Sequence, residues 1–164
     1  MFLCFFTGLI EAQLPNNSVY AVADIPTELR ERAESVIRYE ELKFELLDEH
    51  KATIRFEQVV TILDKDSDAH RVGVFHGPDI RVSHFSASIY DANGVKIRSS
   101  RNVDIEDVLA VGGGNFYVDD RYKSVDMEHG KLPYTVHFKY VLAVKDVGLF
   151  TNMPRWTPMA YSQS

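Results

Sequence analysis

The stretch "YTVHFKYVLAV", residues 134–144, decides the fold class of this 164-residue chain. Large apolar residues occupy alternate positions, which is the period of two that places them on one face of a β-strand. They are Tyr134, Val136, Phe138, Tyr140, Leu142 and Val144. Burying a large side chain contributes roughly 1.5–3 kcal/mol, so this face requires an opposing layer. The pattern therefore predicts a long strand in the core of a layered β-protein.

Two earlier runs have the same period of two. "LKFELL" (residues 42–47) alternates Leu42, Phe44 and Leu46 with charged residues, and "ATIRFEQVVTIL" (residues 52–63) carries apolar residues on one face. The polar "DEHK" (residues 48–51) separates them, so the two runs predict a β-hairpin. "DKDSD" (residues 64–68) then predicts a turn and "HRVGVFHG" (residues 70–77) a short strand.

The segment "IYDANGVKI" (residues 89–97) predicts a second hairpin, because a turn signal divides two alternating runs. We expect a three-residue loop that ends at Gly94, with Asp91 opposite Val95 and Ile89 opposite Ile97. Gly94 would adopt the left-handed conformation and form a bulge. A two-residue loop would instead place Ile89 on the face of charged residues, and matching of the apolar face argues against it.

The segment "DIPTELRERAESVIR" (residues 24–38) predicts the one helix of the chain. Leu29, Ala33 and Val36 recur at helical spacing, and Pro26 suits a first helical turn. Several strands and one helix predict an all-β fold, mainly an antiparallel β-sandwich, with one short amphipathic N-terminal helix.

The opening "MFLCFFTGLI" (residues 1–10) resembles the apolar core of a secretory signal, with Ala12 before a cleavage point. The run is shorter than the roughly 20 residues of a membrane-spanning helix, so we expect no integral membrane segment. We therefore expect residues 1–12 to be the remnant of a signal whose true start lies upstream. Residues 18–164 would form a single β-sandwich-like domain outside the cytoplasm, in the periplasm or at the cell surface.

Charge and cysteine content exclude two classes of function. The net charge is −6 and no basic run occurs, which argues against a nucleic-acid partner. Cys4, the sole cysteine, lies in the predicted signal, so chemistry that needs a Cys nucleophile is excluded for this segment. No G-x-S-x-G motif occurs either. We therefore expect no catalytic residues in this chain.

No metal or cofactor motif stands out. The six histidines match no metal-ligand spacing, although His76 and His84 could approach each other across a loop, and we expect them at solvent-facing positions. They are His50, His70, His76, His84, His129 and His137. "DKDSD" and "DDRYKSVD" lack the pattern of a calcium loop and indicate solvated turns, and "VGGGNFY" lacks the lysine of a phosphate loop and indicates a flexible connection. Trp156, between two prolines, is expected to pack a loop onto the core. We predict no metal and no cofactor.

Five segments in order resemble one bacterial domain of unknown function: "IPTELRERAESVIRYEE", "IYDANGVKI", "DDRYKSVD", "LPYTVHFKYVL" and "MPRWTP". That domain lies N-terminal to a transglutaminase-like core in larger secreted or periplasmic proteins, and the resemblance runs from about residue 25 to residue 158. It implies a β-rich accessory domain without catalytic residues of its own. Members continue past the W-x-P segment, so the resemblance also implies that this chain is truncated at its C-terminal end.

We therefore expect a non-catalytic accessory domain that contacts a downstream transglutaminase-like domain, or another protein, through a sheet face or an edge strand. One alternative is an independent module that binds a glycan or a peptide, with Tyr90 and Tyr122 as candidate contacts. A more remote alternative is a hydrolase that uses Glu57 and Asp119, whose carboxyl groups would have to lie roughly 5–9.5 Å apart in a cleft.

Overall fold

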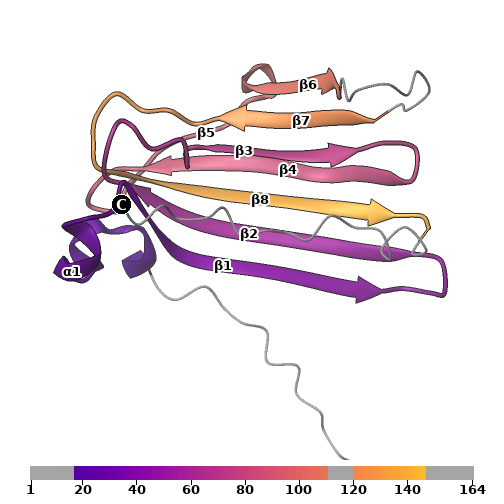
Figure 1. The fold of residues 1–164 in the computed structure, drawn as a ribbon, viewed down its shortest axis with the longest axis horizontal. Coiled ribbons are helices and arrows are strands. Elements are labelled where there is room, and N and C mark those ends of the chain that lie inside the picture. The colour runs from indigo at the N-terminus through magenta and orange to yellow at the C-terminus, as the bar shows by residue number, and fades with distance from the viewer. Residues whose placement is uncertain (1–16, 111–119, 147–164) are drawn as a thin grey trace, which may run out of the picture.

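The computed structural model describes residues 17–110 and 120–146, whose strands form two antiparallel sheets (Figure 1). The larger sheet has the order β1-β2-β8-β4-β5 and the smaller one the order β3-β7-β6. The strands are β1 (Ser35–Leu46), β2 (Ala52–Ile62), β3 (Arg71–His76), β4 (Ile80–Tyr90), β5 (Lys96–Ser99), β6 (Ile105–Leu109), β7 (Arg121–Asp126) and β8 (Tyr134–Val144). The predicted fold class, a mainly antiparallel β-sandwich, is confirmed.

Strand β8 is the centre of the core, as its sequence predicts. It lies between β2 and β4, and its six alternate apolar residues are each at most 3% exposed. Val74, Val125 and Met127, which lie on or directly after strands of the smaller sheet, pack against this face. The two sheets thus bury the stripe that requires an opposing layer.

The β1–β2 hairpin is also confirmed. Leu42 pairs with Phe56 and Leu46 with Ala52. At the turn, the carboxylate of Asp48 accepts hydrogen bonds from the backbone N–H groups of His50 and Lys51 at 2.8 and 2.7 Å. These hydrogen bonds from backbone to side chain stabilise a turn, which explains why β1 ends and β2 begins on either side of "DEHK".

The β4–β5 turn is confirmed, but the register beyond it is not. The backbone N–H of Asp91 donates to the carbonyl oxygen of Val95 at 2.9 Å, and Gly94 has φ +80°, as a three-residue loop requires. A second irregularity then pairs Ile89 with Arg98 instead of Ile97, which is 45% exposed.

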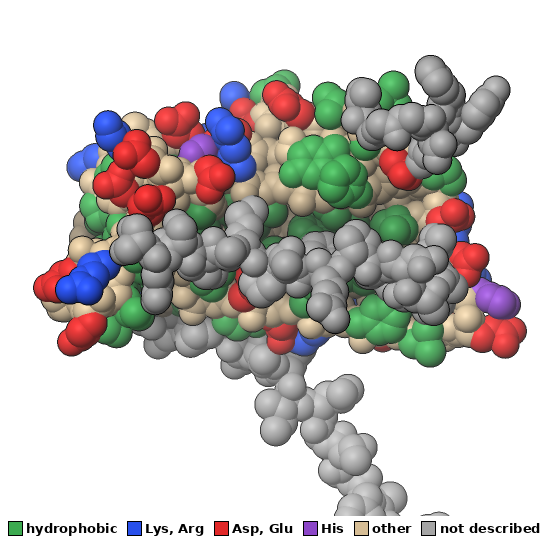
Figure 2. Space-filling model, viewed as in Figure 1, with side chains coloured by type: hydrophobic (Ala, Val, Ile, Leu, Met, Phe, Trp, Pro, Cys, Tyr) green, Lys and Arg blue, Asp and Glu red, His purple; other side chains and the backbone are tan. Residues whose placement is uncertain are grey.

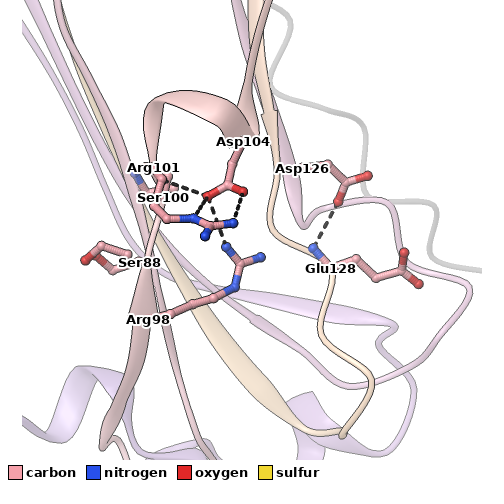
Figure 3. A network of polar contacts seen from close by, with 9 residues as sticks. Ser88, Arg98, Ser100, Arg101, Asp104, Asp126 and Glu128 are labelled. Atoms are coloured by element: carbon pink, nitrogen blue, oxygen red, sulfur yellow. Dashed lines mark hydrogen bonds and ion pairs between the residues drawn. The ribbon is translucent and has the colours of Figure 1, made fainter.

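The guanidinium of Arg98 lies 3.6 Å from Asp104, which Arg101 also contacts (Figure 3). Asp104 belongs to the short 3₁₀ helix η3 (Asn102–Asp104). The extra residue in β5 therefore accompanies an ion pair that the alternation of apolar residues does not encode.

The predicted helix over residues 24–38 is wrong in its extent. The α-helix α1 (Thr27–Arg30) has one turn, and β1 begins at Ser35. The backbone of Glu34 accepts hydrogen bonds from the residues that follow β2, and Val36 pairs with Thr61. The hydrogen bonds and side-chain packing of the β1–β2 ladder outweigh the weak helical propensity of the segment. Leu29 of α1 is 52% exposed, so the helix does not pack an apolar face on the sheet.

Two short 3₁₀ helices, η1 (Asn17–Tyr20) and η2 (Val22–Asp24), precede α1 and lie at one end of the sheets (Figure 1). "DDRYKSVD" is largely strand β7, so the turn expected there is wrong. The signal segment, the triple glycine and Trp156 lie outside the described residues. Within the described ranges, no helix has the length and apolar content needed to cross a membrane.

Candidate functional site

A polar cluster surrounds His137, on the face of the large sheet opposite the smaller one. The Nε2 atom of His137 lies 2.6 Å from a carboxylate oxygen of Glu57, which lies on the neighbouring strand β2 opposite Lys139. Its Nδ1 atom lies 2.9 Å from the hydroxyl of Tyr20. The ammonium of Lys139 lies 2.8 Å from the same Glu57 carboxylate. Three elements that are distant in sequence therefore converge on one imidazole.

The geometry assigns the proton positions in this cluster. A carboxylate only accepts, so Nε2–H of His137 donates to Glu57 and Nδ1 accepts from the hydroxyl of Tyr20. Burial lowers the pKa of His137, and the hydrogen bond to Glu57 offsets this only in part. Burial alone would raise the pKa of Glu57, but bonds from Lys139 and His137 outweigh it and lower that pKa. The cluster therefore pairs a neutral imidazole with an ionised carboxylate.

The cluster has the connectivity of a hydroxyl–imidazole–carboxylate relay, but its electrostatics oppose nucleophilic chemistry. Burial, followed by the proximity of Tyr90, raises the pKa of Tyr20, whereas an activated nucleophile needs the opposite shift. The Tyr20 ring also stacks on Tyr90, with ring centroids 4.0 Å apart. The arrangement therefore holds the Tyr20 side chain in place.

Further bonds fix the N-terminal segment to the same end of the sheet. The backbone oxygen of Tyr20 accepts from the hydroxyl of Thr135, and that of Ala21 accepts from Arg38. Ala21 also forms a bridge to Asn93 in the β4–β5 turn. The turn therefore serves as a docking point for the N-terminal segment, in addition to joining two strands.

A second polar cluster lies on the small sheet around Asp107. Its carboxylate contacts Arg121 at 2.7 Å, His76 at 3.1 Å and Lys123 at 3.2 Å. Partial burial opposes ionisation, but these bonds outweigh it and lower the pKa of Asp107 to about 2. The cluster ties β3, β6 and β7 together.

The structure does not bring the candidate metal ligands together. His76 contacts Asp107, whereas His84 bonds the hydroxyl of Ser86 on the large sheet. Among the described residues, no group of three or more His, Cys, Asp or Glu side chains is placed to hold a metal ion. The expectation that the histidines face solvent is wrong for His70 and His137, which are each 7% exposed, because loops and η1 cover them.

The other candidate residues have different environments. Glu57 is bonded to His137 and Lys139 instead of a second carboxylate, and Asp119 lies outside the described residues. Tyr90 is stacked under Tyr20. Tyr20 itself carries no signal in the sequence, because it lies in a short segment without a clear period.

Tyr122 lies on the outward face of the small sheet. Its ring is 4.8 Å from that of Phe75, which is 64% exposed, and it covers Gly73. A Cβ atom on Gly73 would overlap the hydroxyl oxygen of Tyr122, so a side chain there would displace the ring. Val108, paired with Tyr122 and 52% exposed, extends this aromatic surface.

The exposed apolar surface of β1 is the other prominent feature. Leu42, Leu46 and Leu47, which we call the β1 patch, are 47%, 59% and 58% exposed. Leu42 and Leu46 share a face with their buried or half-buried partners on β2. Strand β1 is also an end strand of the large sheet as described (Figure 1), and hydrophobic side chains reach the surface near its end in Figure 2.

Comparison with known families gives one match. The family described as a domain of unknown function with a solved structure (DUF3857) matches residues 48–162, which is more than half of the chain. None of the curated proteins compared with the chain matches it.

One solved structure has a similar fold. It is described as a "putative protease" from Parabacteroides distasonis ATCC 8503, and it aligns with a TM-score of 0.58 and 13% sequence identity. The alignment covers 69% of this chain but 23% of that protein, so the chain spans less than a quarter of its length. At this identity the likeness concerns the fold alone.

Proposed function

Because the chain belongs to the DUF3857 family of domains of unknown function, we propose that it is a non-catalytic accessory domain of a larger exported bacterial protein. The fold unit it shares with the similar solved structure makes up 23% of that protein, which supports a role within a larger chain. The sequence resemblance suggests that the neighbouring domain is transglutaminase-like. The apolar run at residues 1–10 supports export to the periplasm or cell surface.

The β1 patch carries the proposal. It exposes two leucines on an end strand and a third, Leu47, directly after it, and the backbone groups of an end strand are available for pairing with another chain. Covering each half-exposed leucine contributes on the order of 1 kcal/mol. The patch would thus serve as the contact surface for the downstream domain of the same protein.

The cluster at His137 supports the non-catalytic part of the proposal. A catalytic hydroxyl requires a base that takes its proton, but the pKa of Tyr20 is raised and that of His137 lowered. We infer that the cluster fastens residues 17–25 to the sheet. Any cysteine-dependent activity would then belong to the neighbouring domain.

Chemical crosslinking and hydrogen exchange of the full-length protein test the proposal. We expect the β1 amides to exchange faster when the accessory domain is produced alone, and crosslinks to join β1 to the downstream domain. Leu46→Glu in the full-length protein should reduce the crosslinks to the downstream domain and should make the β1 amides exchange faster. Val108→Glu is the control, because Val108 is similarly exposed but lies on the other sheet. Equal behaviour of the two variants, or no crosslink between the domains, would refute the β1 contact.

The aromatic surface on the small sheet favours a second candidate function, the binding of a glycan. An exposed Phe75 beside Tyr122 offers a flat apolar platform for a sugar ring. A glycan array with the intact protein tests this function, with Phe75→Ala and Tyr122→Ala as variants. Binding that survives both substitutions, or no binding to any glycan, would argue against it.

A further inference from the structure

A small hollow opens at the end of the sandwich, apart from the β1 patch and from the His137 cluster. It has a volume of about 170 Å³ and lies between the loop after β2 and the segment that joins β7 to β8. Ile62 and Tyr134, which pair across β2 and β8, form part of an apolar wall with Leu132. Asp64, His70 and Glu128 contribute polar groups to the lining.

His70 presents a fixed hydrogen-bonding group to this hollow. It is 7% exposed, and its Nδ1 atom lies 2.8 Å from Oδ1 of Asp126. Asp126 also accepts from the backbone N–H of Glu128 (Figure 3) and from the guanidinium of Arg71. Partial burial opposes ionisation of Asp126, but these bonds outweigh it and lower its pKa.

The proton between His70 and Asp126 is therefore on the imidazole, because an ionised carboxylate only accepts. With Nδ1 engaged by Asp126, Nε2 is the ring nitrogen of His70 that is left for another partner. Among the described residues, no hydrogen-bond partner of Nε2 is found, and no fully buried side-chain nitrogen or oxygen lacks a partner. His70 thus lines the hollow with a ring nitrogen that has no partner among the described residues.

The charge and the volume of the hollow indicate which kind of group it could bind. The carboxylates of Asp64 and Glu128 outnumber the one ammonium of Lys65, and none of the three forms an ion pair within the described parts of the chain. Sites for whole small molecules usually measure about 300–1,000 Å³, so the hollow suits a single side chain.

We propose that this hollow, which we call the His70 pocket, receives one basic side chain, of arginine or lysine, from a partner protein. The cationic group would donate to Nε2 of His70 and pair with Glu128 and Asp64. The aliphatic stem would lie on the apolar wall of Ile62 and Leu132, as stems of basic side chains do elsewhere. The proposal rests on the proposed function only in taking the partner to be a protein.

Nuclear magnetic resonance of the chain labelled with ¹⁵N-histidine tests the His70 pocket. The probes are N-acetyl-arginine methylamide and the uncharged N-acetyl-norleucine methylamide. We expect the arginine probe to shift the Nε2 signal of His70 in a saturable manner, with millimolar affinity, and the norleucine probe to leave it unchanged. Equal shifts with both probes, or a change that stays linear in concentration, would overturn the proposal.

Glu128→Gln is the decisive variant, because the side chain of Glu128 makes no hydrogen bond within the described residues and the fold should persist. We expect about fivefold weaker binding of the arginine probe. Glu49→Gln, at an 86% exposed side chain in the β1–β2 turn, is the matched control and should bind as the unmodified chain does. Unchanged affinity in Glu128→Gln would reject the pocket. The isolated chain suffices for this test, so its outcome does not depend on contact through the β1 patch.

Discussion

Substitution of Tyr20 by phenylalanine isolates the contribution of one hydroxyl to the stability of the sandwich. The ring remains, and with it the stacking on Tyr90 and the backbone bond from Thr135. What is lost is the 2.9 Å hydrogen bond to Nδ1 of His137, an acceptor in a residue that is 7% exposed.

The expected loss of stability follows from this geometry. A typical hydrogen bond contributes a net 0.5–1.5 kcal/mol, and a buried acceptor left without a donor costs about 1–3 kcal/mol. Because phenylalanine keeps the cover over His137, water cannot readily replace the hydroxyl. We expect Tyr20→Phe to reduce the free energy of unfolding by about 1–2 kcal/mol.

Urea denaturation followed by fluorescence measures this loss. With an m-value of about 2 kcal/mol/M, the midpoint should fall by about 0.5–1 M. Tyr122→Phe is the matched control, because no hydrogen bond of its hydroxyl is found among the described residues. If Tyr20→Phe and Tyr122→Phe have the same midpoint, the hydroxyl does not fasten the N-terminal segment and the reasoning fails.

Three further substitutions or conditions test other parts of the structure. Gly94→Ala should cost about 1 kcal/mol or more in urea denaturation, because φ is +80° at this position, and a stability equal to that of the unmodified chain would contradict the turn. Phe138→Ala, at a side chain with 0% exposure, should cost about 3–5 kcal/mol, whereas Phe75→Ala, at 64% exposure, should cost about 0.5 kcal/mol or less; similar losses would contradict the assigned core. The folded-state pKa of His137 is lowered, so the contribution of His137 to the free energy of unfolding is complete above its unfolded pKa of about 6.5 and is lost as the pH falls below that value. The lowered pKa of Glu57 adds a further loss of stability below about pH 4.5. The urea midpoint should therefore fall from pH 7.5 to 5.5, and an equally steep fall in His137→Gln would show that another group is responsible.

Much of the sheet can be predicted from the sequence because side chains on a strand alternate with a fixed period. The stripe from Tyr134 to Val144 and the break at "DEHK" both correspond to elements of the structure. The left-handed Gly94 is predicted for a similar reason, since few residues other than glycine adopt that conformation. These signals are local, and a single strand or turn is enough to produce them.

The candidate sites could not be predicted in the same way. Tyr20 and His137 are 117 positions apart, and His70 and Asp126 are 56 apart, so their contacts exist only once strands and loops are packed. The extent of the N-terminal helix shows the same limit, because residues 35–38 have helical spacing in isolation but join the edge of a sheet.

The amino-acid sequence alone determined the class of fold, the central strand and the positions of two turns, because these depend on periodicity and on the conformations open to individual residues. Only the tertiary structure decided which polar side chains are buried, which leucines remain exposed on β1, and where an imidazole nitrogen faces a hollow. Those properties depend on which elements come to lie side by side, and the free energy of a buried polar group is set by neighbours that are remote along the chain.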